Sequence, residues 1–401
     1  MLSDMMLKFT QIRFSRGPMI MRALKIIETE TGGKSYSSHK YCYDEYASPD
    51  QPYEDDQSYA PKQYGETERR DMPKNLKPLA DKLCGRPPLF RYFLDGSRRT
   101  YKVDDIAYGE RIYPIVAGQV GVACCERLTP DRFNVYAVEN RLILCLSEVS
   151  DKDGLRKKFF DGIKNRINKE SNLYTLGLSL SKILTYRDEP DVNYEHKAIA
   201  KIHDEMLDSE KGIVVRISNE NKLNEDSYLI KDGSIEYKTL KAGSYKDLSV
   251  IKNNYRRVVG VSKRFDPEKC VGKKKNNAAK IAELPLYHRT PAFMFESSHS
   301  KGEDGAVYLS AWYVRIRESR HTISPFDGVI KVEKIIVTDQ ERHTGLDSEE
   351  IDLITANLIN ERNPVAYGKD TRWANHLYPV YLTESYIKSR FLSDNFFLNA
   401  L

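Results

Sequence analysis

The stretch "YFLDGSRRTY" at residues 92–101 shares the tripeptide Asp-Gly-Ser with a second stretch, "YLIKDGSIEY", at residues 228–237. In each stretch the acid, Asp95 or Asp232, ends a run of β-branched, aromatic and aliphatic residues that is typical of a buried strand. Asp-Gly alone usually marks a turn, and four further Asp-Gly pairs occur in the chain. The two copies that follow apolar runs therefore predict two acids at strand ends, at the edge of one sheet.

The length and charge of the chain set limits on its class. It has 401 residues, enough for one large core or two ordinary ones, and a formal net charge of +5. This mild basic bias is compatible with a nucleic-acid partner but does not establish one. Lys and Arg concentrate between residues 250 and 280. The run 273–275 is expected to be a solvated loop, whereas Lys263 and Arg264 end the apolar strand "RVVGVS".

Cysteine usage and the N-terminus bear on the compartment. Six cysteines occur without a CxxC pair, which fits neither a zinc site nor a disulfide framework. We expect buried, reduced thiols and a reducing cytoplasm. The first residues lack a secretory signal, and no window approaches the length needed to cross a bilayer. The sequence thus predicts a soluble, cytoplasmic protein.

The domain organisation follows from changes in composition. Residues 1–80 form an N-terminal extension, of which 31–78 is polar and predicted to be an extended, poorly ordered or partner-docking arm. Residues 81–401 form the main domain. Its predicted class is α/β, or α+β, with helices flanking a mixed β-sheet. Strands are expected over 89–96, 111–128, 134–149, 227–233, 257–265, 306–317 and 328–337, and helices over 153–171, 192–210, 245–254 and 347–362.

Two acids at strand ends and a third carboxylate from a helix would form an oxygen-ligand cage. Hard cations such as Mg²⁺ and Mn²⁺ prefer carboxylates and water. Such a cage suits phosphodiester cleavage, because a bound ion lowers the pKa of the attacking water and neutralises charge in the transition state. The pattern predicts a metal-dependent hydrolase.

The order of the motifs resembles a known family. The chain presents "FLDGSR", an acidic helix, "YLIKDGS", "VVGVSKR", "WYVRI", "GVIKVEKI" and a late "LYPVYL", over roughly residues 88–390. This order resembles the NurA nucleases, which work with HerA-type hexameric DNA translocases. The resemblance implies an RNase H-like core, akin to the Piwi domain, and catalytic Mn²⁺ or Mg²⁺. It also implies a homodimer on a HerA-like ATPase, acting on DNA in end resection or anti-phage defence.

The resemblance also implies site residues. Asp95 and Asp232 match the two metal-binding aspartates. The third ligand, a helical glutamate, is best matched by Glu195, with Glu205 as the second choice and Glu210 also near Asp232 in the sequence. A solvated helix face is the alternative for each glutamate.

Further residues are assigned to substrate contacts. Lys263 matches a family lysine that contacts a phosphate, with Arg264 beside it, and Arg315 in "WYVRI" is a candidate for the DNA path. Contacts of this kind would make binding salt-sensitive and largely indifferent to base sequence. Tyr378 matches a late Tyr-Pro. The family's histidine after that motif is missing, and His376, just upstream, is the nearest substitute.

Three alternatives stay open. Glu236-x-Lys238 resembles the end of the PD-(D/E)xK nuclease signature, which would make Lys238 catalytic in a different fold. His203-Asp204, with His196 on the same helix, suggests an HD phosphohydrolase, although helical histidines are more often structural. The third alternative is a non-catalytic DNA-binding adaptor of a ring ATPase, which the missing histidine and the basic segment favour.

Overall fold

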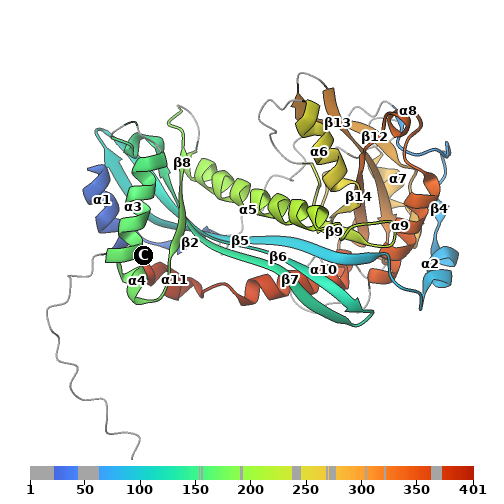
Figure 1. Cartoon of the computed structure of the whole chain (residues 1–401), viewed down its shortest axis with the longest axis horizontal. Coiled ribbons are helices and arrows are strands. Elements are labelled where there is room, and N and C mark those ends of the chain that lie inside the picture. The colour runs from blue at the N-terminus through green and yellow to red at the C-terminus, as the bar shows by residue number, and fades with distance from the viewer. Residues whose placement is uncertain are drawn as a thin grey trace, which may run out of the picture.

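The computed structural model describes most of the chain. The described residues are 22–43, 63–152, 154, 157–189, 193–236, 245–267, 270, 277–302, 305–319, 322–362 and 373–401. They form a mixed α/β protein with one large mixed sheet flanked by helices (Figure 1). The predicted fold class is confirmed at this level.

The sheet contains 14 strands among the described residues. They are β1 Lys34–Ser35, β2 Tyr41–Cys42, β3 Gln63–Tyr64, β4 Lys74–Asn75, β5 Phe90–Tyr108, β6 Arg111–Thr129, β7 Arg132–Ser147, β8 Leu180–Tyr186, β9 Tyr228–Asp232, β10 Val258–Ser262, β11 His288–Arg289, β12 Phe293–Gly302, β13 Gly305–Arg315 and β14 Val329–Ile336. The helices are α1 Ala23–Thr31, α2 Lys77–Leu83, α3 Lys157–Glu170, α4 Asn172–Thr175, α5 Tyr194–Asn219, α6 Tyr245–Tyr255, α7 Ala278–Ala282, α8 Asp339–Thr344, α9 Ser348–Glu361, α10 Tyr378–Ser389 and α11 Asp394–Ala400.

Both parallel and antiparallel pairs build the main path of the sheet. Its order is β3-β12-β13-β14-β10-β9-β5-β6-β7-β8. Strands β5, β6 and β7 form an antiparallel meander, and β9 and β10 continue beside β5 in parallel. Strands β14, β13 and β12 then extend the sheet antiparallel to β10. The centre of the sheet is therefore the parallel group β5, β9 and β10.

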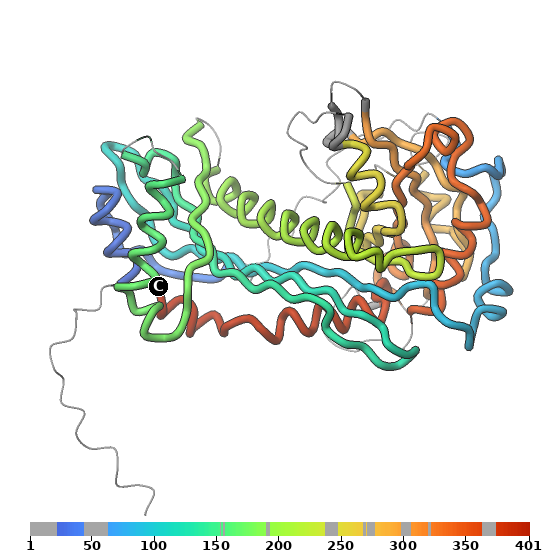
Figure 2. Tube along the Cα trace, viewed as in Figure 1, coloured from blue at the N-terminus to red at the C-terminus, as the bar shows by residue number. Residues whose placement is uncertain are grey.

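Long helices cover both faces of the meander. In Figures 1 and 2, α5 runs along one side of the three long strands, and α10 with α11 runs along the other. A Cβ added at Gly118 would meet Ile202 of α5, and one added at Gly121 would meet Ile387 of α10. Residues an odd number apart point to opposite faces of a strand. The apolar run "IYPIVAGQVGVACC" lacks polar alternation because both its faces are covered.

Most of the predicted elements are confirmed, but others, among them strands β8 and β12, were not predicted. Three further differences bear on the site and its helices. Asp95 lies inside the 19-residue strand β5 and not at its end, because the strand continues through Gly96 in extended pairing with β6. Helix α5 continues past residue 210, where the predicted helix ended, to Asn219. The closing segment, left unassigned by its sequence, forms α10 and α11.

The N-terminal extension is partly built into the sheet. Strands β1 and β2 pair with β5, β3 pairs with β12, and β4 pairs with β11. Within the segment 31–78, which was predicted to be an extended, poorly ordered or docking arm, residues 31–43 and 63–78 are ordered and contribute the extended strands β1 to β4, whereas 44–62 lies outside the described residues, as does 1–21. The loop 273–275 also lies outside them.

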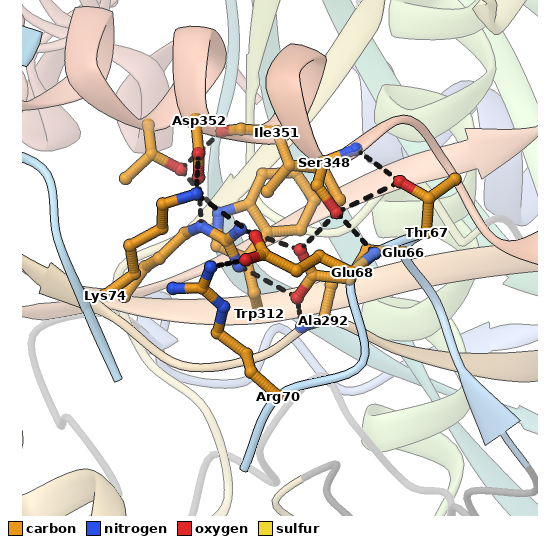
Figure 3. A network of polar contacts seen from close by, with 12 residues as sticks. Glu66, Thr67, Glu68, Arg70, Lys74, Ala292, Trp312, Ser348, Ile351 and Asp352 are labelled. Atoms are coloured by element: carbon orange, nitrogen blue, oxygen red, sulfur yellow. Dashed lines mark hydrogen bonds and ion pairs between the residues drawn. The ribbon is translucent and has the colours of Figure 1, made fainter. Parts of the chain in front are cut away.

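A buried polar network fastens the segment after β3 to the rest of the sheet (Figure 3). The Glu66 carboxylate accepts two hydrogen bonds from the guanidinium of Arg289, at 2.9 and 2.7 Å, and one from Ala292 N at 2.7 Å. Ser348 Oγ donates to it at 3.0 Å, and Arg289 Nε donates to Asp352 at 2.7 Å. Glu66 and Arg289 are fully buried, so their charges depend on one another.

Cysteines and helix hydropathy complete the description. All six cysteines are free, and five are buried. Cys84 is exposed, which the prediction of buried thiols did not anticipate.

Among the helices that the structure describes, none combines the length and the hydropathy that a membrane crossing requires.

We expect Glu66→Ala to lower the free energy of unfolding by about 3–5 kcal/mol, because it leaves the Arg289 guanidinium buried beside a single remaining acid. Urea denaturation of the metal-free protein measures this. Glu68→Ala is the matched control: Glu68 pairs with Arg70 and Lys74 at an exposed position, so less than about 1 kcal/mol should be lost. Equal losses of unfolding free energy for both variants would contradict the inference that Glu66 compensates the buried charge of Arg289.

Candidate metal centre

Strand register brings Asp95 and Asp232 together. The parallel pair β5–β9 aligns Leu94 with Lys231, so the next residue on each strand is an aspartate. Adjacent strands lie about 4.8 Å apart, so two such side chains on one face are neighbours. The parallel pair β9–β10 then aligns Asp232 with Val261, and Lys263 follows two residues later. Three residues from three segments of the sequence are thus placed side by side by backbone pairing alone.

The third carboxylate comes from α10. Glu384 lies in the middle of this helix, which crosses β5 and β6. Gly121 on β6 permits the close approach, since a Cβ there would lie 2.5 Å from Ile387 of α10. Thr383, beside Glu384, donates to the Phe93 carbonyl of β5 at 3.5 Å. The helix therefore presents Glu384 to the sheet face that carries Asp95 and Asp232.

The three carboxylates form a group that fits a metal ion. One oxygen from each of Asp95, Asp232 and Glu384 lies within 4.8 Å of the other two. Asp95 is 4% exposed; its Oδ1 accepts from Gly96 N at 2.8 Å, and its buried Oδ2 accepts no hydrogen bond within the described chain. A buried carboxylate oxygen without a donor is costly unless a cation supplies the missing interaction. The all-oxygen donor set matches Mg²⁺ or Mn²⁺.

Lys263 supplies the positive charge of the group. Its Nζ lies 2.9 Å from Asp232 Oδ2 and 3.3 Å from Glu384 Oε2, and its side chain is 6% exposed. Asn375 Nδ2 holds its backbone carbonyl at 2.6 Å. Burial alone would lower the pKa of Lys263, but the charges of Asp232, Asp95 and Glu384 outweigh burial and raise that pKa above its ordinary value. The ammonium therefore stays charged.

The site disfavours the charged form of Asp95. Burial raises the pKa of Asp95 well above its ordinary value, and the charge of Asp232 raises it further. Lys263 opposes this shift, whereas Glu384 and Glu210 add to it. Three carboxylates face the buried ammonium of Lys263 and the half-exposed ammonium of Lys388, so the group still carries an excess of negative charge that a divalent cation would neutralise.

The structure does not bring the predicted helical glutamates into this group. Glu195 lies at the start of α5 and receives a hydrogen bond from Lys102 at 3.1 Å. Glu205 is held by Arg141 and Lys182, both at 2.6 Å. Glu195 stands fifteen residues before Glu210, which is about 22 Å along the helix axis. The predicted third ligand, Glu195, therefore lies away from Asp95, because it is in the first turn of the long helix α5.

Glu210 lies against Gly96, next to Asp95 in the chain, but on the other side of the sheet. A Cβ on Gly96 would lie 2.4 Å from Glu210 Oε1, so Glu210 packs against the β5 face opposite to that of Asp95. It forms a buried ion pair with Lys231 at 3.0 Å, with both side chains at most 3% exposed. Lys231 also donates to the Asp232 carbonyl at 2.8 Å. This pair supports the strand from behind.

The other predicted site residues have diverse positions. Arg264 is exposed beside Lys263. Arg315 is 3% exposed and donates to the carbonyls of Leu284, Asp327, Ala282 and Pro325. Its guanidinium thus joins the end of α7 to neighbouring loops and is buried, so it is not exposed for the predicted role on the DNA path. Tyr378 is half-buried at the start of α10, two helical turns before Glu384, and His376 is buried with its ring 5.4 Å from that of Tyr381.

The residues behind the two rival signatures can be located as well. Lys238 lies outside the described residues, so the PD-(D/E)xK pair with Glu236 stays a prediction. His196 is exposed on α5, and His203 and Asp204 are partly buried. Of the residues that the structure describes, only Asp95, Asp232 and Glu384 form a group of three potential ligands, which leaves the HD pattern without support.

Comparisons with known proteins give no further guide. No protein-family model matches the chain, and no curated protein matches it as a relative. The family resemblance therefore stays a hypothesis that rests on the order of the motifs.

We expect Asp95→Asn to raise the free energy of unfolding of the metal-free protein near neutral pH by about 1–2 kcal/mol, since it removes a buried, repelled negative charge. Mn²⁺ should raise the Tm of the wild type, and the same variant should lose this increase. Thermal unfolding in EDTA and in Mn²⁺ measures both effects. Asp208→Asn, exposed on α5, is the control and should behave as wild type. A destabilised Asp95→Asn that kept its Mn²⁺ response would contradict the metal centre.

Proposed function

We propose that this chain is a divalent-metal-dependent DNA nuclease that hydrolyses phosphodiester bonds. One observation carries the proposal: Asp95, Asp232 and Glu384 converge from two strands and a helix around a buried carboxylate oxygen that lacks a donor. Carboxylates fixed on rigid elements are the protein's main contribution to metal-assisted phosphodiester cleavage.

The arrangement of strands supports an RNase H-like core. The antiparallel meander β5 to β7 has the parallel strands β9 and β10 beside β5, with an additional strand β8 paired to the far side of β7, and the two aspartates lie on the adjacent strands β5 and β9. This agrees with the fold that the NurA resemblance implies. The proposed third acid is Glu384 on α10 and not the predicted Glu195, because an oxygen of Glu384 lies within 4.8 Å of oxygens of Asp95 and Asp232.

The residues of the chain have distinct tasks in the proposed reaction. Asp95, Asp232 and Glu384 would hold the cation, which when bound supplies an activated water and neutralises charge on the phosphate. Lys263 remains protonated among them and orients Asp232 through its 2.9 Å contact. Arg264, exposed one residue later, is placed to meet a phosphate oxygen. No base-reading element is needed, so cleavage would depend little on sequence.

The proposed partners follow from the resemblance. A homodimer that receives DNA from a HerA-like hexameric ATPase is the arrangement expected for a NurA nuclease, in DNA end processing or anti-phage defence. The absence of a histidine after Tyr378-Pro379 favours a second candidate, a non-catalytic adaptor of the same ATPase. The two candidates differ in whether the purified chain, alone or with the ATPase, cleaves DNA.

The test is a nuclease assay on linear DNA with Mn²⁺, Mg²⁺ or EDTA, with and without a HerA-like ATPase. The wild type should cleave with either metal and not with EDTA. Asp232→Asn and Glu384→Gln should each lower the rate by about 100-fold or more, because each removes a ligand.

Glu195→Gln is the matched control and should keep wild-type activity, because its carboxylate pairs with Lys102 away from the group. If Glu195→Gln abolishes cleavage and Glu384→Gln does not, the ligand assignment is wrong. A wild type that binds DNA and the ATPase but cleaves under no condition would leave the adaptor as the function.

A further inference from the structure

Two lysines hold the Glu384 carboxylate, and they differ in their environment. Lys263 Nζ lies 3.3 Å from Oε2, and Lys388 Nζ lies 2.7 Å from Oε1. The Lys263 side chain is 6% exposed, and the Lys388 side chain is 48% exposed. Each oxygen of Glu384, the proposed third ligand, is therefore in contact with an ammonium group.

A cation that binds Glu384 must compete with at least one of these ammonium groups. Like charges at such short range repel, so binding of the cation weakens one lysine contact. Lys263 is buried between Asp232 and Glu384, and its removal from the acids would leave its charge without compensation. Lys388 lies in the last turn of α10 and is half exposed. Its side chain can therefore rotate to place the ammonium in solvent at little cost in free energy.

We propose that Lys388 is a positioning residue that exchanges with the metal ion. In the metal-free protein it neutralises Glu384 and holds the carboxylate in place. When the cation binds, it releases Lys388 to solvent, where the ammonium attracts the phosphate backbone of the incoming DNA. This proposal rests on the metal centre of the proposed nuclease and adds a residue that links occupancy of that centre to binding of DNA.

A purely structural role of Lys388 makes a different prediction. A Glu-Lys pair at this spacing stabilises a helix only slightly. Its loss would change neither the affinity for a metal ion nor the affinity for DNA. Exchange predicts that loss of Lys388 strengthens metal binding, because a competing positive charge is removed. It also predicts that the same loss weakens DNA binding, because a charge that attracts the phosphate backbone is removed.

The experiment compares Lys388→Gln with the wild type. Isothermal titration with Mn²⁺, without DNA, should show binding that is about threefold to tenfold tighter in the variant. Fluorescence anisotropy with a short, cleavage-resistant phosphorothioate DNA in Mn²⁺ should show binding that is about threefold to tenfold weaker. Lys388→Arg keeps the charge and should restore both values towards those of the wild type.

Arg390→Gln is the matched control. Arg390 caps the same helix, is exposed, and carries the same charge. The control should leave Mn²⁺ affinity unchanged. An unchanged or weaker Mn²⁺ affinity in Lys388→Gln, or an equal gain in Arg390→Gln, overturns the proposal.

The outcomes also separate this proposal from the proposed function. A wild type that binds Mn²⁺ but cleaves no DNA refutes the nuclease, while the comparison of Mn²⁺ affinities still decides the role of Lys388. A wild type that binds no Mn²⁺ overturns both.

Discussion

The parallel pairing of β9 with β5 is the constraint on which the candidate site depends. Because Leu94 is aligned with Lys231, Asp95 and Asp232 follow as neighbours on one face, although 136 residues lie between them in the sequence. Pairing of β10 with β9 adds Lys263 to the same edge. A shift of one residue in this register would turn Asp232 to the opposite face and separate the acids.

The alternation of side chains across this sheet divides its buried charges into two layers. Asp95 and Asp232 face α10, where carboxylates outnumber ammonium groups and a cation would neutralise the remaining negative charge. Their neighbours Gly96 and Lys231 face α5, where Glu210 and Lys231 neutralise one another. The α5 layer is a closed ion pair that stabilises the strands from behind, and the α10 layer is the one whose charge is incomplete. This difference, and not proximity to Asp95 alone, makes Glu384 the better ligand than Glu210.

The sequence was sufficient for many of the elements and for part of the site, but not for β8, β12, α10 or α11. Apolar runs predicted the strands because burial of both faces selects such residues, and Asp95, Asp232 and Lys263 are brought together as their motifs suggested. The third acid was missed because Glu384 reaches the group through the packing of α10 on β5 and β6, which no local pattern encodes. The close approach at Gly121 is the one local sign of that packing. Gly233, with φ +82°, ends β9 as its motif predicted, whereas Gly96 continues β5.

The charge balance of the α10 layer explains why two lysines of different exposure surround one glutamate. Three carboxylates around the buried Lys263 would repel one another strongly in the absence of a cation. Lys388 offsets part of that repulsion from the solvent side, through Glu384 Oε1. A second buried lysine would neutralise Glu384 in a fixed ion pair, as Lys231 does for Glu210. An exposed lysine offsets the charge reversibly, so it would stabilise the metal-free protein without blocking the proposed binding of a divalent cation.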